Sequence, residues 1–466
     1  MSRLIVVSNR VNPPADANVG SAGGLAMALA AALRESSGVW FGWSGETVET
    51  FTGQITMQKV AGVTVALVAL EEQDRREYYN GYANKTLWPL LHSRTDLAVF
   101  ERSFGEGYER VNRRFAETLR PLIGEDDLIW VHDYHLFPLA QELRRLGVTN
   151  RIGFFLHVPW PGRRLMTTLP EHRQLVEAML DYDVIGFQTR DSQEAFEDYV
   201  ARELEGEAAD GRVTVGERSA AVGAFPIGIE GEAFAKTAAG ERAGTMLARM
   251  RLSQAGRKTI LGVDRLDYSK GLEERFLAYE QLLADHPEWA EQVYLLQIAT
   301  PSRDEVDAYQ EIRARLDGVS GRINGAYATV DWVPVRYVNR AYRRDELAGV
   351  YRAAHVGLVT PLRDGMNLVA KEYVAAQDPE DPGVLVLSRY AGAAEQMTDA
   401  LIVNPFSRED LSEALAVALA MPLAERRARW ERLMEGVLRD DVAAWRDAFV
   451  RALEGGPLTR SRSACG

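Results

Sequence analysis

The sequence predicts an α/β fold with two doubly wound domains. Short, uninterrupted apolar runs alternate with segments of helical periodicity along nearly the whole chain. Apolar strands of this kind, placed between helices, are typical of parallel sheets covered by helices on both faces. The chain has 466 residues, which is too long for one ordinary hydrophobic core, so two domains are expected. Ligands of such domains bind at the carboxyl ends of the strands.

Each expected element follows from its local pattern. The apolar runs expected to form strands are, in chain order, Leu4–Ser8, Thr64–Leu70, Leu128–His132, Arg151–Leu156, Val184–Phe187, Thr259–Val263, Tyr294–Ala299, Val356–Thr360 and Val384–Leu387. Apolar residues at helical spacing predict the helices Leu25–Glu35, Leu139–Leu146, Glu274–His286, Arg303–Leu316 and Asp441–Leu453. The composition-biased segment 203–218 is expected to be a surface loop or short hairpin. A domain boundary is expected after Glu230, near the polar stretch 231–244, giving domains of residues 1–230 and 231–438.

Composition excludes several classes of protein. A hydrophobic content of 46%, a charged content of 26% and a net charge of −13 fit a soluble globular protein and argue against nucleic-acid or anionic-membrane partners. The single cysteine, Cys465, lies in a polar tail, so neither a disulfide framework nor a thiolate metal site is expected. No apolar run of membrane-spanning length occurs, and the chain enters a strand at Leu4 without a signal-peptide pattern. We therefore expect a cytoplasmic protein.

The most informative segment runs from His355 to Ala376. An apolar strand is followed by a turn at Asp364 and Gly365 and by helical spacing from Asn367 onward. A strand, turn and helix in this order direct free backbone N–H groups and the positive end of the helix dipole at one place, where a diphosphate binds well. Glu372, about one turn further along, could accept hydrogen bonds from ribose hydroxyls. The pattern indicates a nucleotide-sugar site; the alternative is an ordinary βα unit with a plain turn and a solvated Glu372.

A second candidate is the segment Gly262–Gly271. A strand ends near Val263, and Arg265 and Lys270 then bracket a tight loop that leads into a helix. Two cations at the carboxyl end of a parallel strand suit a diphosphate leaving group, and the alternative is two exposed surface charges.

The amino-terminal strand ends in a cation, Arg10, and a loop with the glycines of the segment Gly20–Gly24 follows it. Tandem glycines before a helix allow close approach of a ligand to the backbone. Neither the dinucleotide fingerprint nor the P-loop pattern is present, so a plain flexible loop is the alternative.

Two further strands end in histidines. His132, Asp133 and His135 suggest a metal site at first sight, but no second cluster at ligand spacing supports it, so we expect no metal and no cofactor. Asp133 and His157 are better interpreted as polar groups that face a sugar, whereas His132 is expected to be a buried core residue.

Four more side chains complete a possible phosphosugar pocket. Tyr78, Tyr79 and Trp88 would supply aromatic walls, and Arg303 would supply a guanidinium for the phosphate. Each aromatic residue, taken alone, is more often part of a core.

Together these segments resemble the bacterial trehalose-6-phosphate synthases. The resembling segments, which follow the family order over nearly the whole chain, are Val6–Arg10, Ser21–Gly24, Trp40–Glu46, Leu87–Pro89, Val131–Leu136, Arg265–Gly271, Arg322–Gly325 and Leu358–Gln377. The resemblance implies two Rossmann-like domains facing across a cleft, the GT-B arrangement, with a helix in residues 439–466 crossing back to the first domain. It also implies retaining transfer of glucose from UDP-glucose to glucose 6-phosphate, and a homo-oligomer, either a dimer or a tetramer.

The resemblance assigns roles by motif matching. It implies an acceptor site formed by Arg10, Tyr79, Trp88, Asp133 and Arg303. It implies a donor site formed by Gly23, Gly24, Arg265, Lys270, Tyr342, Asp364, Leu368, Val369, Ala370, Lys371 and Glu372. His157 would lie near the transferred glucose, and the residues expected to act in catalysis are His157, Asp133, Arg265 and Lys270.

The residues themselves fit that chemistry, because cations can stabilise charge that develops on a departing diphosphate without a metal. No carboxylate in the motifs is an obvious nucleophile, so an internal-return path is the expectation at family level. The chain departs from the family after His157, where Arg164 stands at the position of an expected Glu.

Two other classes of function stay open at this stage. The first is a related synthase with another acceptor or donor, such as a glucosylglycerol-phosphate or validoxylamine-type enzyme. The second is a non-catalytic sugar-phosphate sensor, against which the intact Arg265, Lys270, Asp364 and Glu372 argue.

Overall fold

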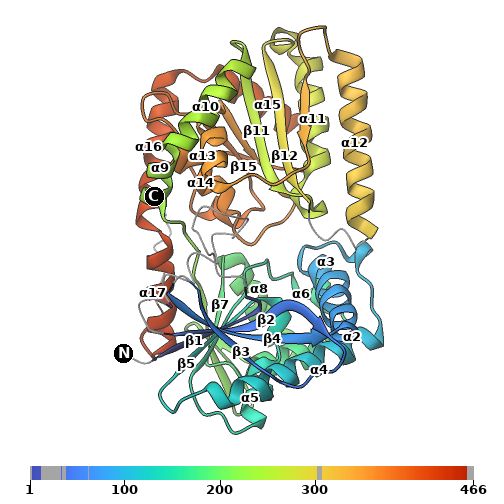
Figure 1. The fold of residues 1–466 in the computed structure, drawn as a ribbon, viewed down its shortest axis with the longest axis vertical. Helices are drawn as coiled ribbons and strands as arrows, with labels where there is room; N and C mark the ends of the chain where they lie inside the picture. Colours follow the sequence, from blue (N-terminus) through green and yellow to red (C-terminus); the bar gives the residue numbers. More distant parts are fainter. Residues whose placement is uncertain (1–2, 12–32, 34–37, 61, 302–306, 459–466) are drawn as a thin grey trace. The chain divides into compact units, whose positions relative to one another are not determined.

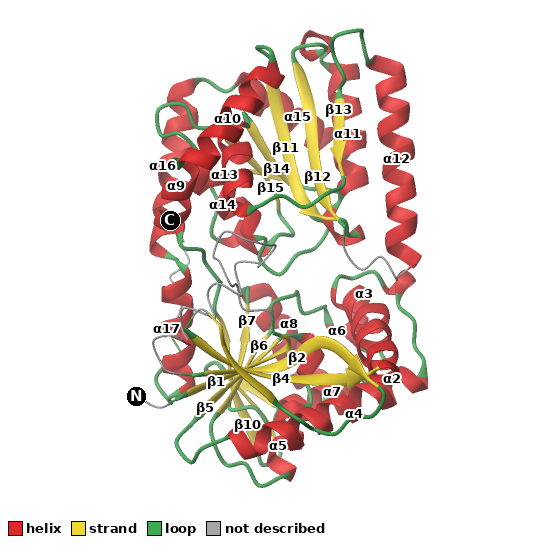
Figure 2. Ribbon diagram, in the orientation of Figure 1, coloured by secondary structure: helices red, strands yellow, loops and turns green. Residues whose placement is uncertain are grey.

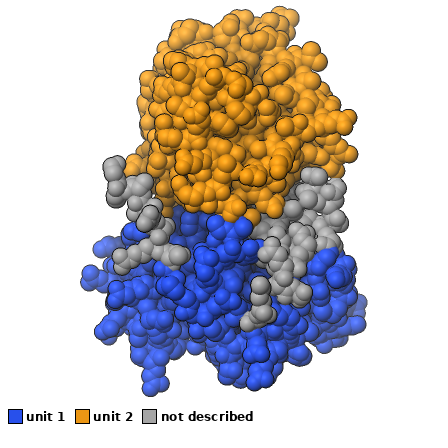
Figure 3. Space-filling model, turned by 90° about the vertical axis from the view of Figure 1, so that its left-hand side faces the viewer, with its two compact units in different colours: residues 1–17, 22–227, 443–466 blue, residues 18–21, 228–442 orange. Residues whose placement is uncertain are grey.

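The computed structural model describes residues 3–11, 33, 38–60, 62–301 and 307–458, which divide into two compact units (Figure 3). Unit 1 contains the described residues up to Ile227 together with those from Ala443 onward, and unit 2 contains Gly228–Val442. The division falls inside the segment Pro226–Glu230, after which the sequence predicted a boundary. Gly23, Gly24, Arg303 and the helix expected at 25–35 lie outside the described residues.

Unit 1 is built on a mostly parallel sheet. Ten strands of the described chain form it in the order β3-β4-β2-β1-β5-β6-β7-β10-β9-β8. Their bounds are β1 Leu4–Arg10, β2 Val39–Val48, β3 Thr56–Val60, β4 Val63–Glu71, β5 Leu128–His132, β6 Ile152–Phe155, β7 Val184–Phe187, β8 Glu207–Ala209, β9 Arg212–Val215 and β10 Arg218–Ala224. The central strands β5, β6 and β7 are buried along their whole length, as expected for strands with helices on both faces. Only the edge pairs β3–β4, β8–β9 and β9–β10 are antiparallel.

Helices cover the sheet of unit 1 (Figures 1 and 2). Their bounds are α2 Glu72–Asp74, the π-helix η1 Arg75–Leu87, α3 Trp88–Leu91, η2 Thr95–Leu97, α4 Arg102–Leu119, η3 Arg120–Leu122, η4 Tyr134–Leu136, α5 Leu139–Arg145, α6 Arg163–Met166, α7 His172–Met179, α8 Arg190–Glu203 and α17 Val442–Leu453.

The carboxy-terminal helix α17 packs directly on this sheet. The ring of Phe449 stacks on Trp130 of β5 at 4.6 Å, and it lies against two glycines, Gly153 of β6 and Gly186 of β7. A Cβ atom at either glycine would lie within 2.8 Å of the Phe449 ring. The glycines therefore make room for the helix, because any larger side chain would force it away from the sheet.

Unit 2 has a wholly parallel sheet. Among the described residues its strand order is β13-β12-β11-β14-β15-β16. The bounds are β11 Lys258–Arg265, β12 Val293–Thr300, β13 Val335–Val338, β14 Val356–Val359, β15 Val384–Ser388 and β16 Leu401–Val403.

Two groups of helices cover the faces of this sheet (Figure 1). Helices α11 Leu272–Asp285, α12 Asp307–Tyr327 and α15 Arg408–Ala420 form one group. The other group is α9 Gly231–Ala238, α10 Glu241–Gln254, α13 Arg344–Ala353, α14 Leu368–Ala376 and α16 Leu423–Arg439. The short turns are η5 Tyr268–Lys270, η6 Pro287–Trp289 and η7 Gly392–Glu395.

The predicted α/β class with two parallel-sheet domains is confirmed. Every predicted strand has a counterpart, the segment 203–218 contains the hairpin β8–β9, and the predicted helices in the described residues are present. The sequence did not predict β2, whose second half is exposed and polar, or β3, most of whose residues are exposed. It also did not predict β10, β13 and β16. Of the helices in the described residues, none combines the length and apolar character that a bilayer crossing requires.

Candidate active site

Both units place their candidate residues where the strand order reverses. In unit 1 the chain proceeds from β1 to β2 on one side and from β5 to β6 on the other, so the switch point lies between the paired strands β1 and β5. In unit 2 the corresponding point lies between β11 and β14. Arg10 and Arg265 are the last residues of β1 and β11, Asp133 directly follows β5, and Asp364 lies in the loop after β14. Ligands of open α/β sheets bind at such points.

An aromatic cluster gathers at the switch point of unit 1. The Arg10 guanidinium lies 5.8 Å from the centroid of the Trp43 ring, and the Tyr79 ring contacts the same indole at 5.4 Å. Tyr79 also stacks on His135 at 6.0 Å. The structure therefore brings the predicted residues Arg10 and Tyr79 together around Trp43. Tyr79 belongs to the π-helical segment η1, a geometry that is frequent at functional sites.

Tyr78 and Trp88 have different surroundings. Tyr78 is fully buried, and its hydroxyl donates to Asn9 Oδ1 at 2.8 Å, so it is a core residue. Trp88 is also buried, with its ring 5.7 Å from that of Tyr134. The predicted acceptor residue Trp88 thus reaches the aromatic cluster through Tyr134, which contacts His135 at 4.1 Å.

Asp133 has a backbone conformation that is rare for a residue with a side chain. Its φ is 74° and its ψ is 164°, a combination that costs free energy and is often found at functional sites. Its N–H donates to Phe155 O at 2.8 Å, and its Oδ1 accepts from the backbone N–H of His157 at 3.2 Å. These two bonds fix the ends of β5 and β6 to each other.

The two histidines behind Asp133 are neutral near pH 7. Burial lowers the pKa of His157 to about 3, and burial together with His157 lowers the pKa of His132 well below its ordinary value. His132 is fully buried, as the sequence predicted for a core residue. The described residues contain no group of three or more His, Cys, Asp or Glu side chains that could hold a metal.

In unit 2 the loops after β11 and β14 are tied together. Leu362 N–H donates to Ser269 O at 2.8 Å, and Lys270 Nζ lies 2.5 Å from Asp364 Oδ2. The side chains of Lys270 and Asp364 are only 10% and 15% exposed, whereas Arg265 is exposed at the end of β11. Lys270 is therefore not an exposed surface charge, whereas the Arg265 side chain is accessible to solvent.

The buried guanidinium of Arg275 forms hydrogen bonds with residues at the ends of both strands. Arg275 of α11 is fully buried, pairs with Asp264, and donates to Thr360 Oγ1 at 2.9 Å and to the backbone carbonyl of Lys270 at 3.0 Å. One side chain thus holds the ends of both switch-point strands. Gly271, with a φ of 65°, allows the turn into α11.

Helix α14 begins close to the same switch point, in the loop that follows β14. Its N-cap, Asn367, has a φ of 76° and makes no side-chain cap bond, so the amides of the first turn stay available for an anion. Among the predicted donor residues, Leu368 and Val369 are half-buried, and Ala370 and Lys371 are buried. Lys371 Nζ donates to Gln396 Oε1 at 2.7 Å, and burial lowers the pKa of Lys371 to about 8.

Glu372 is not simply solvated. It lies 3.7 Å from Arg344 and accepts a hydrogen bond from Tyr351, while burial raises its pKa against the effect of Arg344. Tyr342 is half-buried in the loop after β13, with its ring 4.5 Å from the Arg340 guanidinium.

The segment that departs from the family pattern has a packed core residue and an exposed cation. Trp160 is 1% exposed and makes edge contacts with Phe137, Phe187 and Phe196. Arg164 is exposed, whereas Arg163 pairs with Glu203 at 2.6 Å. Trp160 therefore anchors the segment in unit 1, and Arg164 takes no part in that packing.

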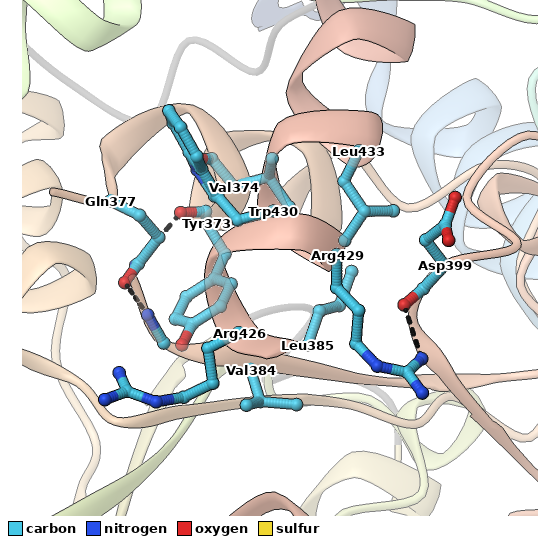
Figure 4. A pocket seen from close by; sticks show the side chains of 11 residues that line it. Tyr373, Val374, Gln377, Val384, Leu385, Asp399, Arg426, Arg429, Trp430 and Leu433 are labelled. Atoms are coloured by element: carbon cyan, nitrogen blue, oxygen red, sulfur yellow. Dashed lines mark hydrogen bonds between the residues drawn. The ribbon is translucent and has the colours of Figure 1, made fainter. Parts of the chain in front are cut away.

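Two hollows lie away from these residues. The one in Figure 4, between α14, β15 and α16, has a volume of about 10 Å³, room for about one water molecule. The other, in unit 1, has about 120 Å³ and is lined by residues of α4, α5 and α7 together with Tyr82. No predicted site residue lines either hollow.

Several residues that shape the site were not predicted. Trp43 lies on β2, a strand that the sequence pattern did not reveal. Gln188 and Arg275 contact site residues that are far from them in sequence, and no local motif marks them. Trp43 could have been found, because it belongs to the quoted segment Trp40–Glu46.

Three comparisons with known proteins find the same family. The model of glycosyltransferase family 20 matches residues 2–455. A trehalose-6-phosphate synthase of Cronobacter sakazakii is 49% identical over 457 residues, which cover 97% of this chain and 95% of that protein. A crystal structure of a UDP-forming α,α-trehalose-phosphate synthase from Burkholderia xenovorans, in complex with glucose-6-phosphate, has 50% identity and a TM-score of 0.92, covering 97% of this chain and 100% of that one. An E. coli structure bound with UDP-2-fluoro glucose has 46% identity and a TM-score of 0.92, covering 97% and 99%.

Proposed function

We propose a function for this chain from its family, because the chain belongs to glycosyltransferase family 20. It transfers glucose from UDP-glucose to glucose 6-phosphate and releases α,α-trehalose 6-phosphate and UDP. The observation that carries this proposal is that residues matching the synthase motifs stand at the switch points of the two sheets, with the Lys270–Asp364 ion pair and a helix start without a side-chain cap in unit 2. Relatives whose names state the same reaction, at nearly half identity along the whole chain, support it.

Unit 1 binds the acceptor in this proposal. Arg10 holds the phosphate of glucose 6-phosphate, because guanidinium groups bind phosphate oxygens with directed, charge-assisted hydrogen bonds. The family resemblance assigns the same role to Arg303, which lies outside the described residues. Tyr79 and Trp88 form walls for the sugar, and Asp133 accepts hydrogen bonds from its hydroxyls. The cluster of Arg10, Trp43 and Tyr79 supports this assignment.

Unit 2 binds the donor. The diphosphate lies against Arg265, Lys270 and the first-turn amides of α14, Leu368 to Lys371, with Asp364 and Tyr342 beside it and Glu372 accepting from the ribose hydroxyls. The family resemblance also assigns donor binding to Gly23 and Gly24, which lie outside the described residues. Because Lys270 is paired with Asp364 at 2.5 Å, its ammonium is held in one place before the donor arrives, which favours electrostatic stabilisation without reorganisation.

The reaction then proceeds by departure of the diphosphate. Negative charge grows on the phosphate oxygens as the glycosidic bond breaks, and Arg265, Lys270 and the α14 amides stabilise it. The departing phosphate accepts the proton of the acceptor hydroxyl, which attacks from the same face and so retains the configuration. His157 lies beside the transferred glucose.

The relatives compared above favour this reaction over a glucosylglycerol-phosphate or validoxylamine-type synthesis and over a sugar-phosphate sensor. Assembly into a dimer or tetramer and a cytoplasmic location remain predictions from the family resemblance.

The test is a product assay. The purified chain is incubated with UDP-, GDP- or ADP-glucose and with glucose 6-phosphate or glycerol 3-phosphate, and release of the nucleoside diphosphate is measured. We expect release with UDP-glucose and glucose 6-phosphate, and two α-anomeric signals in the NMR spectrum of the product. Release with glycerol 3-phosphate alone, or a β-anomeric signal, would overturn the proposal.

A further inference from the structure

A chain of hydrogen bonds runs behind His157. The backbone N–H of Ile227 donates to Gln188 Oε1 at 3.0 Å, and Gln188 Nε2 lies 3.3 Å from His157 Nδ1. His157 Nε2 lies 3.0 Å from His132 Nδ1. Both ring nitrogens of His157 are therefore engaged by other side chains of unit 1.

The donor and acceptor properties of these groups allow only one direction of donation along this series of hydrogen bonds. A backbone N–H can only donate, so the Gln188 oxygen faces Ile227 and its amide nitrogen faces His157. That amide nitrogen can only donate, so His157 Nδ1 must be a bare acceptor. A neutral imidazole has one N–H, so the proton is on His157 Nε2 and is donated to His132 Nδ1. By the same logic, the proton of His132 is on its Nε2.

The last group in this series of hydrogen bonds, His132 Nε2, is energetically unfavourable. His132 is fully buried, and its Nε2 has no hydrogen-bond partner in the described residues. The rings of Trp130 and Trp445 lie 4.7 and 6.4 Å from the His132 ring. A buried donor without an acceptor is unfavourable, and in native proteins it calls for a functional or structural reason.

The reason lies in what His157 holds in place. Its backbone N–H donates to Asp133 Oδ1 at 3.2 Å, and Asp133 has the unusual φ of 74°. Trp445 of α17 packs 6.1 Å from the His157 ring, and Phe155 packs 4.7 Å from it. Hydrogen bonds to Gln188 and His132 and aromatic packing thus hold the His157 ring in place. The backbone N–H of His157 in turn holds the Asp133 carboxylate.

We propose that Gln188 is a positioning residue for the glucosyl transfer: it holds His157 in the Nε2-protonated neutral tautomer and, through the His157 peptide, holds the Asp133 carboxylate. The role in catalysis rests on the proposed function, whereas the tautomer does not. With both nitrogens engaged inside unit 1, His157 is neither a general acid nor a general base, and it serves as a fixed surface beside the sugar.

The test variant is Gln188→Glu. A glutamate keeps the size of the side chain and still accepts from Ile227 N–H, but it presents an acceptor to His157 Nδ1 in place of a donor. The imidazole must then carry a proton on Nδ1. Gln141→Glu is the matched control, because the oxygen of Gln141 accepts from Arg145 at 3.0 Å and a carboxylate keeps that bond. In the described part of the chain, Gln141 shares no hydrogen bond with a predicted site residue.

The tautomer is measured by nitrogen NMR on protein labelled with ¹⁵N-histidine, without substrate. A His157→Asn variant assigns the His157 signals. We expect a bare Nδ1 and a protonated Nε2 in the unaltered chain and in Gln141→Glu, and a protonated Nδ1 in Gln188→Glu. A protonated Nδ1 in the unaltered chain would overturn the inference, and so would an unchanged pattern in Gln188→Glu.

Kinetics test the positioning role. Gln188→Glu should lower kcat by about 10–100-fold, taking as a guide the range found when a hydrogen-bond partner that orients a metal-ligating histidine is lost, while the donor KM changes little. Gln141→Glu should keep its kcat, and the thermal midpoint of each variant, followed by circular dichroism, shows whether it is folded. A folded Gln188→Glu with unaltered kcat would refute the positioning role. Absence of transfer by the unaltered chain would refute the proposed function instead, and it would leave the tautomer result standing.

Discussion

The ion pair between Lys270 and Asp364 allows a stability prediction that can be worked from the structure. Its atoms are 2.5 Å apart, and the two side chains are 10% and 15% exposed, so water screens the pair little. Removing one partner of a fully buried pair costs about 3–5 kcal/mol, whereas exposed pairs contribute about 0–1 kcal/mol. Lys270→Met keeps most of the side-chain volume but removes the ammonium that faces Asp364. We expect it to lower the free energy of unfolding of unit 2 by about 2–4 kcal/mol, between those limits and closer to the first.

The double variant Lys270→Met/Asp364→Asn sharpens the prediction. It removes both charges, and Asn367 can still donate to the remaining side-chain oxygen at position 364, as it does to Asp364 at 3.0 Å. The double variant should therefore be more stable than Lys270→Met, because no buried carboxylate is left uncompensated.

Urea unfolding with hydrogen-exchange mass spectrometry on peptides of unit 2 measures these differences. The matched control is Arg315→Met, which breaks a pair with Glu273 that is 57% and 26% exposed and should cost about 0.5 kcal/mol or less. The reasoning would be refuted by a Lys270→Met variant no less stable than this control. The single variant Asp364→Asn completes the cycle, and a double variant whose loss of stability equals the sum of the losses of Lys270→Met and Asp364→Asn would refute the reasoning as well.

Three further changes have defined outcomes. Lys270→Ala should lower kcat by about 10²–10³-fold, measured with UDP-glucose varied at saturating glucose 6-phosphate, since a hydrogen-bond donor to the transition state is lost. A near-normal kcat with a raised donor KM would mean that Lys270 binds the ground state and the transition state equally. The native pKa of Lys371, about 8, lies below the unfolded value of about 10.4. At pH values between these two pKa values, the unfolded state therefore binds more protons than the native state. Stability should therefore rise from pH 8 to 10 in urea unfolding, and this rise should vanish in Lys371→Met. Gly357→Ala places a Cβ 2.7 Å from the buried Tyr373 ring and should cost about 1–3 kcal/mol in the same assay.

The elements of the fold were predictable from local pattern. Strands such as β5, β7 and β14 are buried along their whole length, so each is an uninterrupted apolar run that marks itself in the sequence. Strand β2 was missed because its polar second half emerges from the core, so the run of apolar residues stops early.

Part of the candidate site was predictable for the same local reason. Arg10, Asp133, Arg265 and Asp364 directly follow strands or their turns, and the carboxyl ends of parallel strands are where ligands bind. The helix from Asn367 and the buried state of His132 also followed from residues adjacent in sequence.

By itself, then, the sequence determined the α/β class, the buried strands and the polar residues at their ends, because these depend on neighbours along the chain. Only the tertiary structure decided which of these residues meet. Lys270 pairs with Asp364 because β11 and β14 are neighbours in the sheet, and Gln188 bonds to His157 because β6 and β7 are neighbours. Helix α17 covers His132 and His157 only because Gly153 and Gly186 leave room for it on the sheet. Strand order and close packing join residues far apart in the chain, and local periodicity does not encode those pairings.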